Sequence, residues 1–148
     1  MQIRNKKYLQ INGEKLRVGI VVARFNKEFT DALLVNALDA LEKCKVSDKN
    51  IRVVSVAGVV EIPYILQKLA ITKKFDFLVA LGCVIKGKTP HFDYVCKMAQ
   101  EGILKVMLDK NIPISFGVLT VNNEKQAKER LHVGKEAALA ALESALIK

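Results

Sequence analysis

The sequence has no apolar run long enough to cross a lipid bilayer. Hydrophobic residues make up 51% of the 148 positions, but charged or glycine-containing stretches interrupt them at short intervals. The first ten residues, MQIRNKKYLQ, also lack the apolar core of a signal peptide. We therefore expect no membrane partner and no export signal.

Cysteine is scarce as well. The three cysteines, Cys44, Cys83 and Cys96, form no C-x-x-C pair and no spacing typical of metal ligands. An odd number of cysteines fits reduced thiols better than a disulfide framework. We expect a cytoplasmic protein without a bound metal, in which the thiols pack as small apolar side chains.

Acidic residues are outnumbered by basic ones, at 15 Asp and Glu against 24 Lys and Arg, which gives a formal net charge of +9. Such an excess suits either nucleic acid or a small anionic substrate. The basic residues are scattered along the chain, and no aromatic residues are interleaved with them as in single-strand-binding surfaces. We therefore expect a phosphorylated small molecule as substrate and no nucleic-acid partner.

Four short runs rich in Val, Ile and Leu alternate with helical patterns. The runs are 17–22, 51–57, 77–81 and 114–119, and the helical patterns are 26–44, 62–72, 90–110, 124–131 and 135–147. Continuous apolar runs are typical of parallel strands that are covered on both faces. The pattern predicts one α/β domain over residues 1–148, a three-layer sandwich whose four-stranded parallel sheet has helices on both faces. Residues 1–13 fit this domain poorly and predict an extended segment that packs on a neighbouring subunit.

Ligands of open parallel sheets bind beyond the carboxyl ends of the strands. Applied here, this rule brings together the loops 23–26, 58–61, 82–89 and 120–123. These loops supply an aromatic ring, a carboxylate, several amides and backbone suited to close approach. We expect a site for a flat polar heterocycle and a phosphate group.

The segment LGCVIKGKTPHFDYVC, residues 81–96, joins a buried strand directly to a helix. Thr89 is a good N-cap and Pro90 suits the first helical position, so the partial positive charge of the helix start, together with Lys88, favours an anion. His91 lies within reach of the same point and is a candidate for proton transfer. The alternative is a well-capped helix with a surface histidine and no ligand.

The motifs of the strand-end loops resemble those of the lumazine synthase family. The matching segments are VVARFN (21–26), AGVVEIP (57–63), LGCVIKGKTPHFDYV (81–95) and PISFGVLTVNNEKQAKER (113–130). The resemblance implies a flavodoxin-like fold and pentamers, which in some members form sixty-subunit shells. It also implies condensation of 5-amino-6-(ribitylamino)uracil with 3,4-dihydroxy-2-butanone 4-phosphate to 6,7-dimethyl-8-ribityllumazine, phosphate and water. It implies no metal and no organic cofactor.

For the uracil substrate, the resemblance implies contacts by seven residues of one subunit. Phe25 stacks on the pyrimidine ring, although by position alone it could be a core residue. The pyrimidine edge faces the backbone of Cys83, Val84 and Ile85. The ribityl chain contacts Val59, Val60 and Glu61.

For the phosphate, the resemblance implies binding by Lys88 and Thr89, with His91 as the proton shuttle. Two residues come from the adjacent subunit: Phe116 lines the pyrimidine pocket, and Arg130 holds the phosphate. From the sequence pattern alone, Phe116 is expected in the core and Arg130 on a solvated helix surface.

The chain departs from the family pattern after Arg130. Members that form shells carry a longer turn of the type Gly-Thr-Lys-Ala-Gly-Asn-Lys-Gly, whereas this chain has Leu-His-Val-Gly-Lys at 131–135. Shell formation is therefore not expected. Lys135 could replace a family lysine near the phosphate.

Two other functions fit the same fold. One is an archaeal-type riboflavin synthase acting on two lumazines, and the other is a flavodoxin-like binding module without catalysis. The module lacks support because neither an acidic cluster nor a Ser/Thr-Gly-rich phosphate loop follows the first apolar run.

Overall fold

Buried strands and amphipathic helices alternate along the whole described chain, residues 11–148 of a computed structural model. The strands are β1 (Val18–Ala23), β2 (Ile51–Val56), β3 (Phe77–Ile85) and β4 (Ile114–Val121). The helices are α1 (Lys27–Lys43), α2 (Ile62–Ile71), α3 (His91–Asp109), α4 (Glu124–Lys128) and α5 (Val133–Ala145). Two 3-10 turns, η2 (Asp48–Asn50) and η3 (Val59–Glu61), flank β2.

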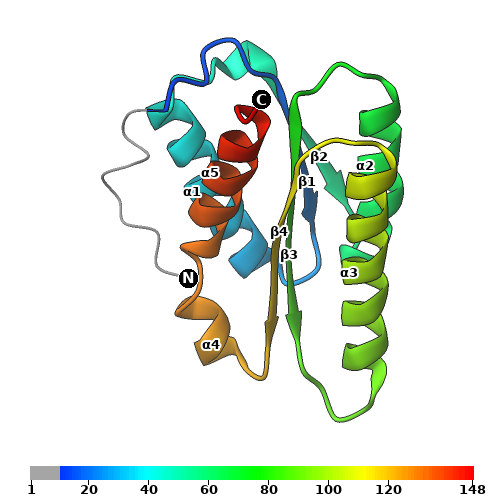
Figure 1. Cartoon of the computed structure of the whole chain (residues 1–148). Helices are drawn as coiled ribbons and strands as arrows, with labels where there is room; N and C mark the ends of the chain where they lie inside the picture. Colours follow the sequence, from blue (N-terminus) through cyan, green and yellow to red (C-terminus); the bar gives the residue numbers. More distant parts are fainter. Residues whose placement is uncertain (1–10) are drawn as a thin grey trace.

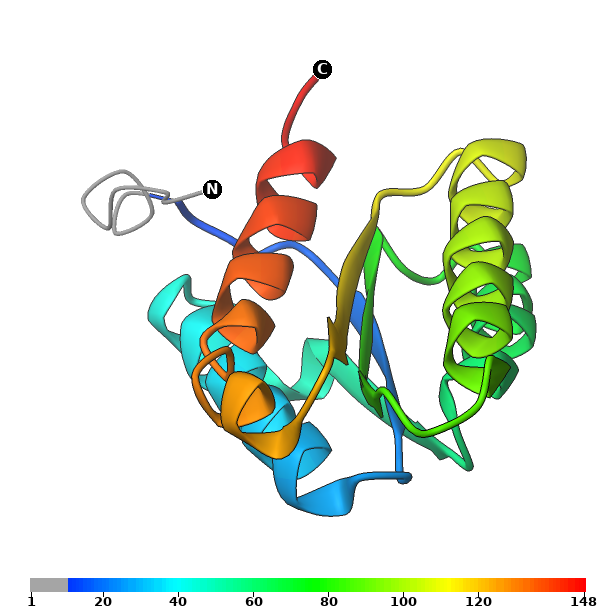
Figure 2. The ribbon, with the colours of Figure 1, turned by 90° about the horizontal axis from the view of Figure 1, so that it is seen from below.

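The four strands of the described residues form one sheet in the order β2-β1-β3-β4, and every pair is parallel. Helices α1, α4 and α5 cover one face, and α2 and α3 cover the other (Figure 1). A second view shows the sheet as the middle of three layers (Figure 2). The predicted three-layer α/β fold is confirmed.

A separate apolar core lies on each face of the sheet. Leu33, Leu41 and Leu142 from α1 and α5 pack against one face, and Ile62, Leu66 and Ile103 from α2 and α3 pack against the other. A fully buried side chain of this size stabilises the fold by about 1.5–3 kcal/mol. The strands are therefore held rigidly, and so are the loops at their ends. None of the helices between residues 11 and 148 is long and apolar enough to cross a membrane.

Strand β3 extends beyond its neighbour β1. Pairing of β1 with β3 ends at Val22 and Leu81, whereas pairing of β3 with β4 continues to Ile85 and Val121. On the β1 side, β3 therefore has no strand neighbour after Leu81 in the described part of the chain. The sequence pattern predicts a strand end at Leu81 and a loop from Gly82, so the predicted strand end is four residues too early. The extra residues form an edge to which a ligand can bind.

Strand β2 differs from the prediction that all strands are covered on both faces. Arg52, Val53 and Ser55 are exposed. The cause is position: β2 is an edge strand that pairs only with β1 among the described residues. Its continuous apolar character was therefore a poor guide to burial.

Most predicted helix ends differ from the structure by one to three residues. Helix α3 begins at His91, and α4 ends at Lys128 rather than 131. Helix α5 begins at Val133 rather than 135, so the connection between α4 and α5 covers residues 129–132 instead of the predicted 132–134.

Most of the predicted N-terminal segment, 1–13, lies outside the described residues. The backbone N–H of Gly13 donates a 2.7 Å hydrogen bond to the carbonyl of Cys44, and Ile11 packs against the core beside α1. These last residues of the segment therefore contact their own chain.

Candidate active site

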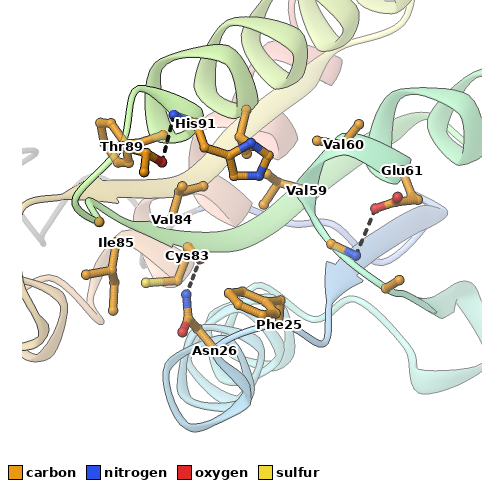
Figure 3. A pocket seen from close by; sticks show the side chains of 15 residues that line it. Phe25, Asn26, Val59, Val60, Glu61, Cys83, Val84, Ile85, Thr89 and His91 are labelled. Carbon is orange, nitrogen blue, oxygen red and sulfur yellow. Dashed lines mark hydrogen bonds between the residues drawn. The ribbon is translucent and has the colours of Figure 1, made fainter.

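A cavity of about 510 Å³ opens beyond the carboxyl ends of β1 and β3. Its walls come from three connections, those after β1, β2 and β3 (Figure 3). The lining residues are Phe25, Asn26, Ala57, Gly58, Val59, Val60, Glu61, Cys83, Val84, Ile85, Gly87, Thr89, His91, Phe92 and Val95. The cavity lies where the strand-end rule predicts it, but the fourth predicted loop, 120–123, is not among its lining residues.

The connection from β1 to α1 forms the first wall. The backbone N–H groups of Arg24 and Phe25 donate to the carbonyls of Val56 and Ala57, at 2.8 and 3.0 Å, and so continue the pairing of β1 with β2. The Phe25 ring is nevertheless 73% exposed. A fixed backbone with an exposed aromatic ring provides a stacking surface, and the alternative of a core phenylalanine is wrong.

The second wall is the turn η3. The backbone N–H of Gly58 donates a 3.0 Å hydrogen bond to Oε2 of Glu61. This contact holds the carboxylate over the start of the turn instead of leaving it to rotate in solvent. Val59 is buried beneath it and Val60 is half-buried. Glu61 therefore offers a fixed acceptor for hydroxyl groups at the cavity rim.

The third wall is the end of β3. Cys83 is 2% exposed, and burial raises the pKa of its thiol to about 11. The thiol therefore stays protonated at neutral pH, so Cys83 is not a nucleophile here. This agrees with its interpretation as a small apolar packing residue.

The junction of β3 with α3 carries His91. The backbone N–H of His91 donates to Oγ1 of Thr89 at 3.4 Å, a long and weak bond, and Pro90 takes the N-cap position. The prediction of Pro90 as the first helical residue is thus displaced by one position. The imidazole of His91 lies across the cavity from the Phe25 ring (Figure 3). The helix start and the histidine therefore face one cavity from the same side.

Nine of the twelve predicted site residues line this cavity: Phe25, Val59, Val60, Glu61, Cys83, Val84, Ile85, Thr89 and His91. Lys88 is exposed on the loop beside Thr89. Phe116 and Arg130 are also outside the cavity. Phe116 lies on the edge strand β4, where it pairs with Ala80, and it is 41% exposed, so its expected place in the core is wrong. Arg130 follows α4, where its Nη1 donates to the carbonyl of Gln126 at 2.9 Å.

Asn26 lines the cavity, and sequence reasoning assigned it no role. Its backbone has φ 61° and ψ 48°, a left-handed conformation that asparagine tolerates better than most residues. The only sequence signal that could have indicated a role for this residue is its position between a predicted strand and a predicted helix. Within residues 11–148, no group of His, Cys, Asp and Glu side chains could hold a metal ion.

Comparison with known proteins agrees with these observations. The sequence profile described as 6,7-dimethyl-8-ribityllumazine synthase matches residues 15–148. The chain belongs to this family. A lumazine synthase of Desulfatibacillum aliphaticivorans is 46% identical over 138 residues, which cover 90% of this chain and 89% of the relative. The lumazine synthase of Kosmotoga olearia is 44% identical over 141 residues, which cover 92% of this chain and 90% of the relative. The lumazine synthase of Protochlamydia amoebophila is 43% identical over 139 residues, which cover 90% of this chain and 81% of the relative.

The resemblance to lumazine synthases drawn from the loop motifs is therefore confirmed. A departure from the family pattern was predicted for the region after Arg130. Nδ2 of Asn36 on α1 donates a 2.9 Å hydrogen bond to the carbonyl of Leu131 and fixes the short turn. Lys135 lies in the first turn of α5 and is not among the residues that line the cavity.

Proposed function

We propose that this chain condenses 5-amino-6-(ribitylamino)uracil with 3,4-dihydroxy-2-butanone 4-phosphate to form 6,7-dimethyl-8-ribityllumazine. The observation that carries the proposal is the single cavity that joins an exposed aromatic ring, a fixed carboxylate and a histidine at a helix start. Each group suits one part of the two substrates. Family membership supports the same reaction.

In this proposal the pyrimidine stacks on Phe25, and its polar edge meets the free edge of β3. The ribityl hydroxyl groups donate to Glu61 beside Val59 and Val60. The phosphate of the second substrate binds near Thr89 and Lys88, where backbone N–H groups of the first turn of α3 have no helical partner. Holding both substrates in register removes much of the entropic barrier to their condensation.

His91 assists the proton transfers. The amine of the uracil attacks the ketone, and water leaves to give an imine. Phosphate is then eliminated, the ribityl-bearing nitrogen attacks the carbonyl group that results, and loss of a second water closes the ring. A well-placed acid or base contributes about 10²- to 10⁴-fold to such steps. Negative charge that develops on the departing phosphate is stabilised by Lys88 and by the start of α3.

We also propose that the site is completed by a second copy of the chain in a pentamer. Phe116 and Arg130 lie outside the cavity of their own chain, and Phe116 is partly exposed. Large apolar side chains are exposed on the outer layer formed by α2 and α3, namely Tyr64, Ile71, Tyr94, Met98, Leu104 and Leu108. An apolar surface of this kind is typical of an oligomer interface. Residues 1–13 are proposed to reach a neighbouring subunit.

The short turn after Arg130 supports a pentamer that does not close into a shell. None of the three cysteines forms a disulfide within the described residues, which fits the reducing cytoplasm.

One assay tests the function against its competitors. The purified chain is supplied with the uracil and butanone phosphate substrates, and lumazine formation is followed by absorbance. Lumazine release above the uncatalysed rate supports the proposal. Riboflavin made from lumazine alone would instead identify a riboflavin synthase, and binding without turnover would identify a non-catalytic module.

A further inference from the structure

The side chain of Asn26 connects two walls of the cavity. Its Nδ2 donates a 2.8 Å hydrogen bond to the carbonyl oxygen of Cys83, 57 positions away in the sequence. Phe25, the neighbour of Asn26, carries the aromatic wall, and Cys83 belongs to the free edge of β3. Figure 3 shows the amide of Asn26 beside the Phe25 ring and directed at β3. We infer that Asn26 is a positioning residue that sets the width of the slot between Phe25 and β3, in which the heterocycle of the uracil substrate binds. The inference rests on the proposed function.

The direction of the backbone groups along β3 supports this role. The N–H groups of Leu78 and Lys86 donate to the carbonyls of Pro113 and Val121, at the two ends of the β3–β4 pairing. Backbone groups alternate between the two sides of a strand, so even-numbered residues of β3 face β4 and odd-numbered ones face the opposite side. Cys83 and Ile85 therefore direct their N–H and C=O groups toward the cavity. Val84 directs its backbone to β4 and reaches the cavity with its side chain (Figure 3).

Strand β1 does not pair with this part of β3, so the carbonyl of Cys83 has no strand partner there. Asn26 takes the place of that partner. The bond leaves the polar groups of Ile85, two positions further on, as the part of the edge available to the ring. The slot thus has a stacking wall and a hydrogen-bonding wall, and one side chain fixes the distance between them.

Few residue types can do what Asn26 does. Its backbone is left-handed, and its carbonyl accepts hydrogen bonds from the N–H groups of Phe29 and Thr30, which begin α1. Glycine accepts the backbone conformation but has no amide. Aspartate has the same size and tolerates the conformation, but it cannot donate to the Cys83 carbonyl. Alanine lacks both properties.

Slot width matters because stacking is short-ranged. A gap of about 0.5–1 Å already forfeits a quarter to a half of the dispersion attraction between facing atoms. Loss of the amide bond should therefore weaken binding of the ring. The phosphate end of the site, near Thr89, lies on a different connection and should be unaffected.

The experiment compares Asn26→Gly, Asn26→Asp and Asn26→Ala with the wild type, measuring Tm, kcat and the KM of each substrate separately. We expect all three variants to raise the KM for 5-amino-6-(ribitylamino)uracil about five- to thirtyfold, with little change in the KM for the butanone phosphate. We expect Tm to fall by a few degrees for Asn26→Ala and to recover in Asn26→Gly. If Asn26→Gly recovers the Tm but not the KM, the effect of Asn26 on substrate binding is separate from its effect on the stability of the start of α1.

Asn111 provides the matched control. It also has a positive φ, 50°, but it lies after α3 and outside the cavity. Asn111→Ala should lower Tm like Asn26→Ala and leave both KM values unchanged.

The inference would be overturned if Asn26→Gly or Asn26→Asp kept the wild-type KM for the uracil substrate. It would also be overturned if the KM values of both substrates rose equally. Wild-type turnover is measured first, so that failure of the proposed function is recognised separately. If the wild type binds the uracil substrate without turnover, the same comparison is made on Kd by calorimetry.

Discussion

A Cβ atom on Gly82 would collide with Cγ1 of Val59. Gly82 is buried in β3, and Val59 is the buried residue of η3, the turn that carries Val60 and Glu61. Absence of a side chain at position 82 thus allows the second wall of the cavity to rest directly on the sheet. The position of Glu61 depends on this contact.

Gly82→Ala should push η3 away from β3. We expect a loss of about 1–3 kcal/mol in the free energy of unfolding, because an extra methyl group is forced into a packed core, and a higher KM for the uracil substrate. Chemical denaturation and steady-state kinetics measure the two effects. Gly87→Ala is the control for stability, because apart from its own chain neighbours no atom lies within 4 Å of the added Cβ. Wild-type stability and KM in Gly82→Ala would contradict the prediction.

His91→Ala should lower kcat by roughly one to three powers of ten and leave the fold unchanged, because orientation of the substrates still supplies part of the rate. Activity is measured across the neutral pH range, with circular dichroism as a check of folding. His132→Ala is the matched control: His132 precedes α5, with Nε2 3.9 Å from a carboxylate oxygen of Glu136, and does not line the cavity. Full kcat in His91→Ala would remove its proposed role in proton transfer.

Mixed oligomers test whether two chains share a site. Arg130→Ala should mainly raise the KM for the butanone phosphate, because it deletes a phosphate contact, whereas His91→Ala lowers kcat. When the two variants are co-refolded, some interfaces pair an intact His91 with an intact Arg130. Activity at subsaturating substrate should then exceed the average of the two pure variants. If mass spectrometry confirms that the chains mix but the activity only equals the average of the two pure variants, His91 and Arg130 belong to the site of one chain.

Stability should fall at high pH because of Cys83. Burial raises the pKa of its thiol from 9.0 to about 11, so its contribution to stability is complete below pH 9 and is lost as the pH rises toward 11. We expect the difference in unfolding free energy between wild type and Cys83→Ala to shrink by up to roughly 2 kcal/mol over this range. Urea denaturation with a reducing agent measures it, and Cys44 and Cys96 are present in both proteins. If the difference in unfolding free energy does not change between pH 9 and 11, the raised pKa of the Cys83 thiol is contradicted.

Light scattering tests the proposed assembly. We expect a particle of five chains at micromolar concentration, held by the apolar residues of α2 and α3. Met98→Asp should dissociate it, because a charge would enter the interface. A monomeric wild type would refute the pentamer, and a megadalton particle would refute the expected absence of a shell.

The sequence predicted most of the fold, because the strands of the sheet centre are continuous apolar runs and the helices have clear apolar faces. The errors occur where tertiary position overrides local pattern. β2 has the composition of a buried strand but lies at an edge, and Phe116 has the composition of a core residue but is partly exposed. Neither burial nor edge position is encoded in a short window of residues.

The cavity itself was predicted in outline from the strand-end loops, and nine residues assigned by resemblance line it. The hydrogen bond of Asn26 was not predictable, because it joins segments far apart in the sequence and depends on β3 extending beyond β1. The extension was missed for a related reason. Gly82 looks like a loop residue until the pairing of residues 82–85 with β4 is known.

The extension of β3 past β1 also bears on how the site can change during evolution. The edge that faces the cavity consists of main-chain groups, so substitutions at positions 83 and 85 that preserve the strand leave those groups in place. A single-residue insertion or deletion between Leu81 and Ile85 is different, because it would exchange the groups that face the cavity with those that face β4. During evolution, the residue types at positions 83 and 85 can therefore change more freely than the length of the segment.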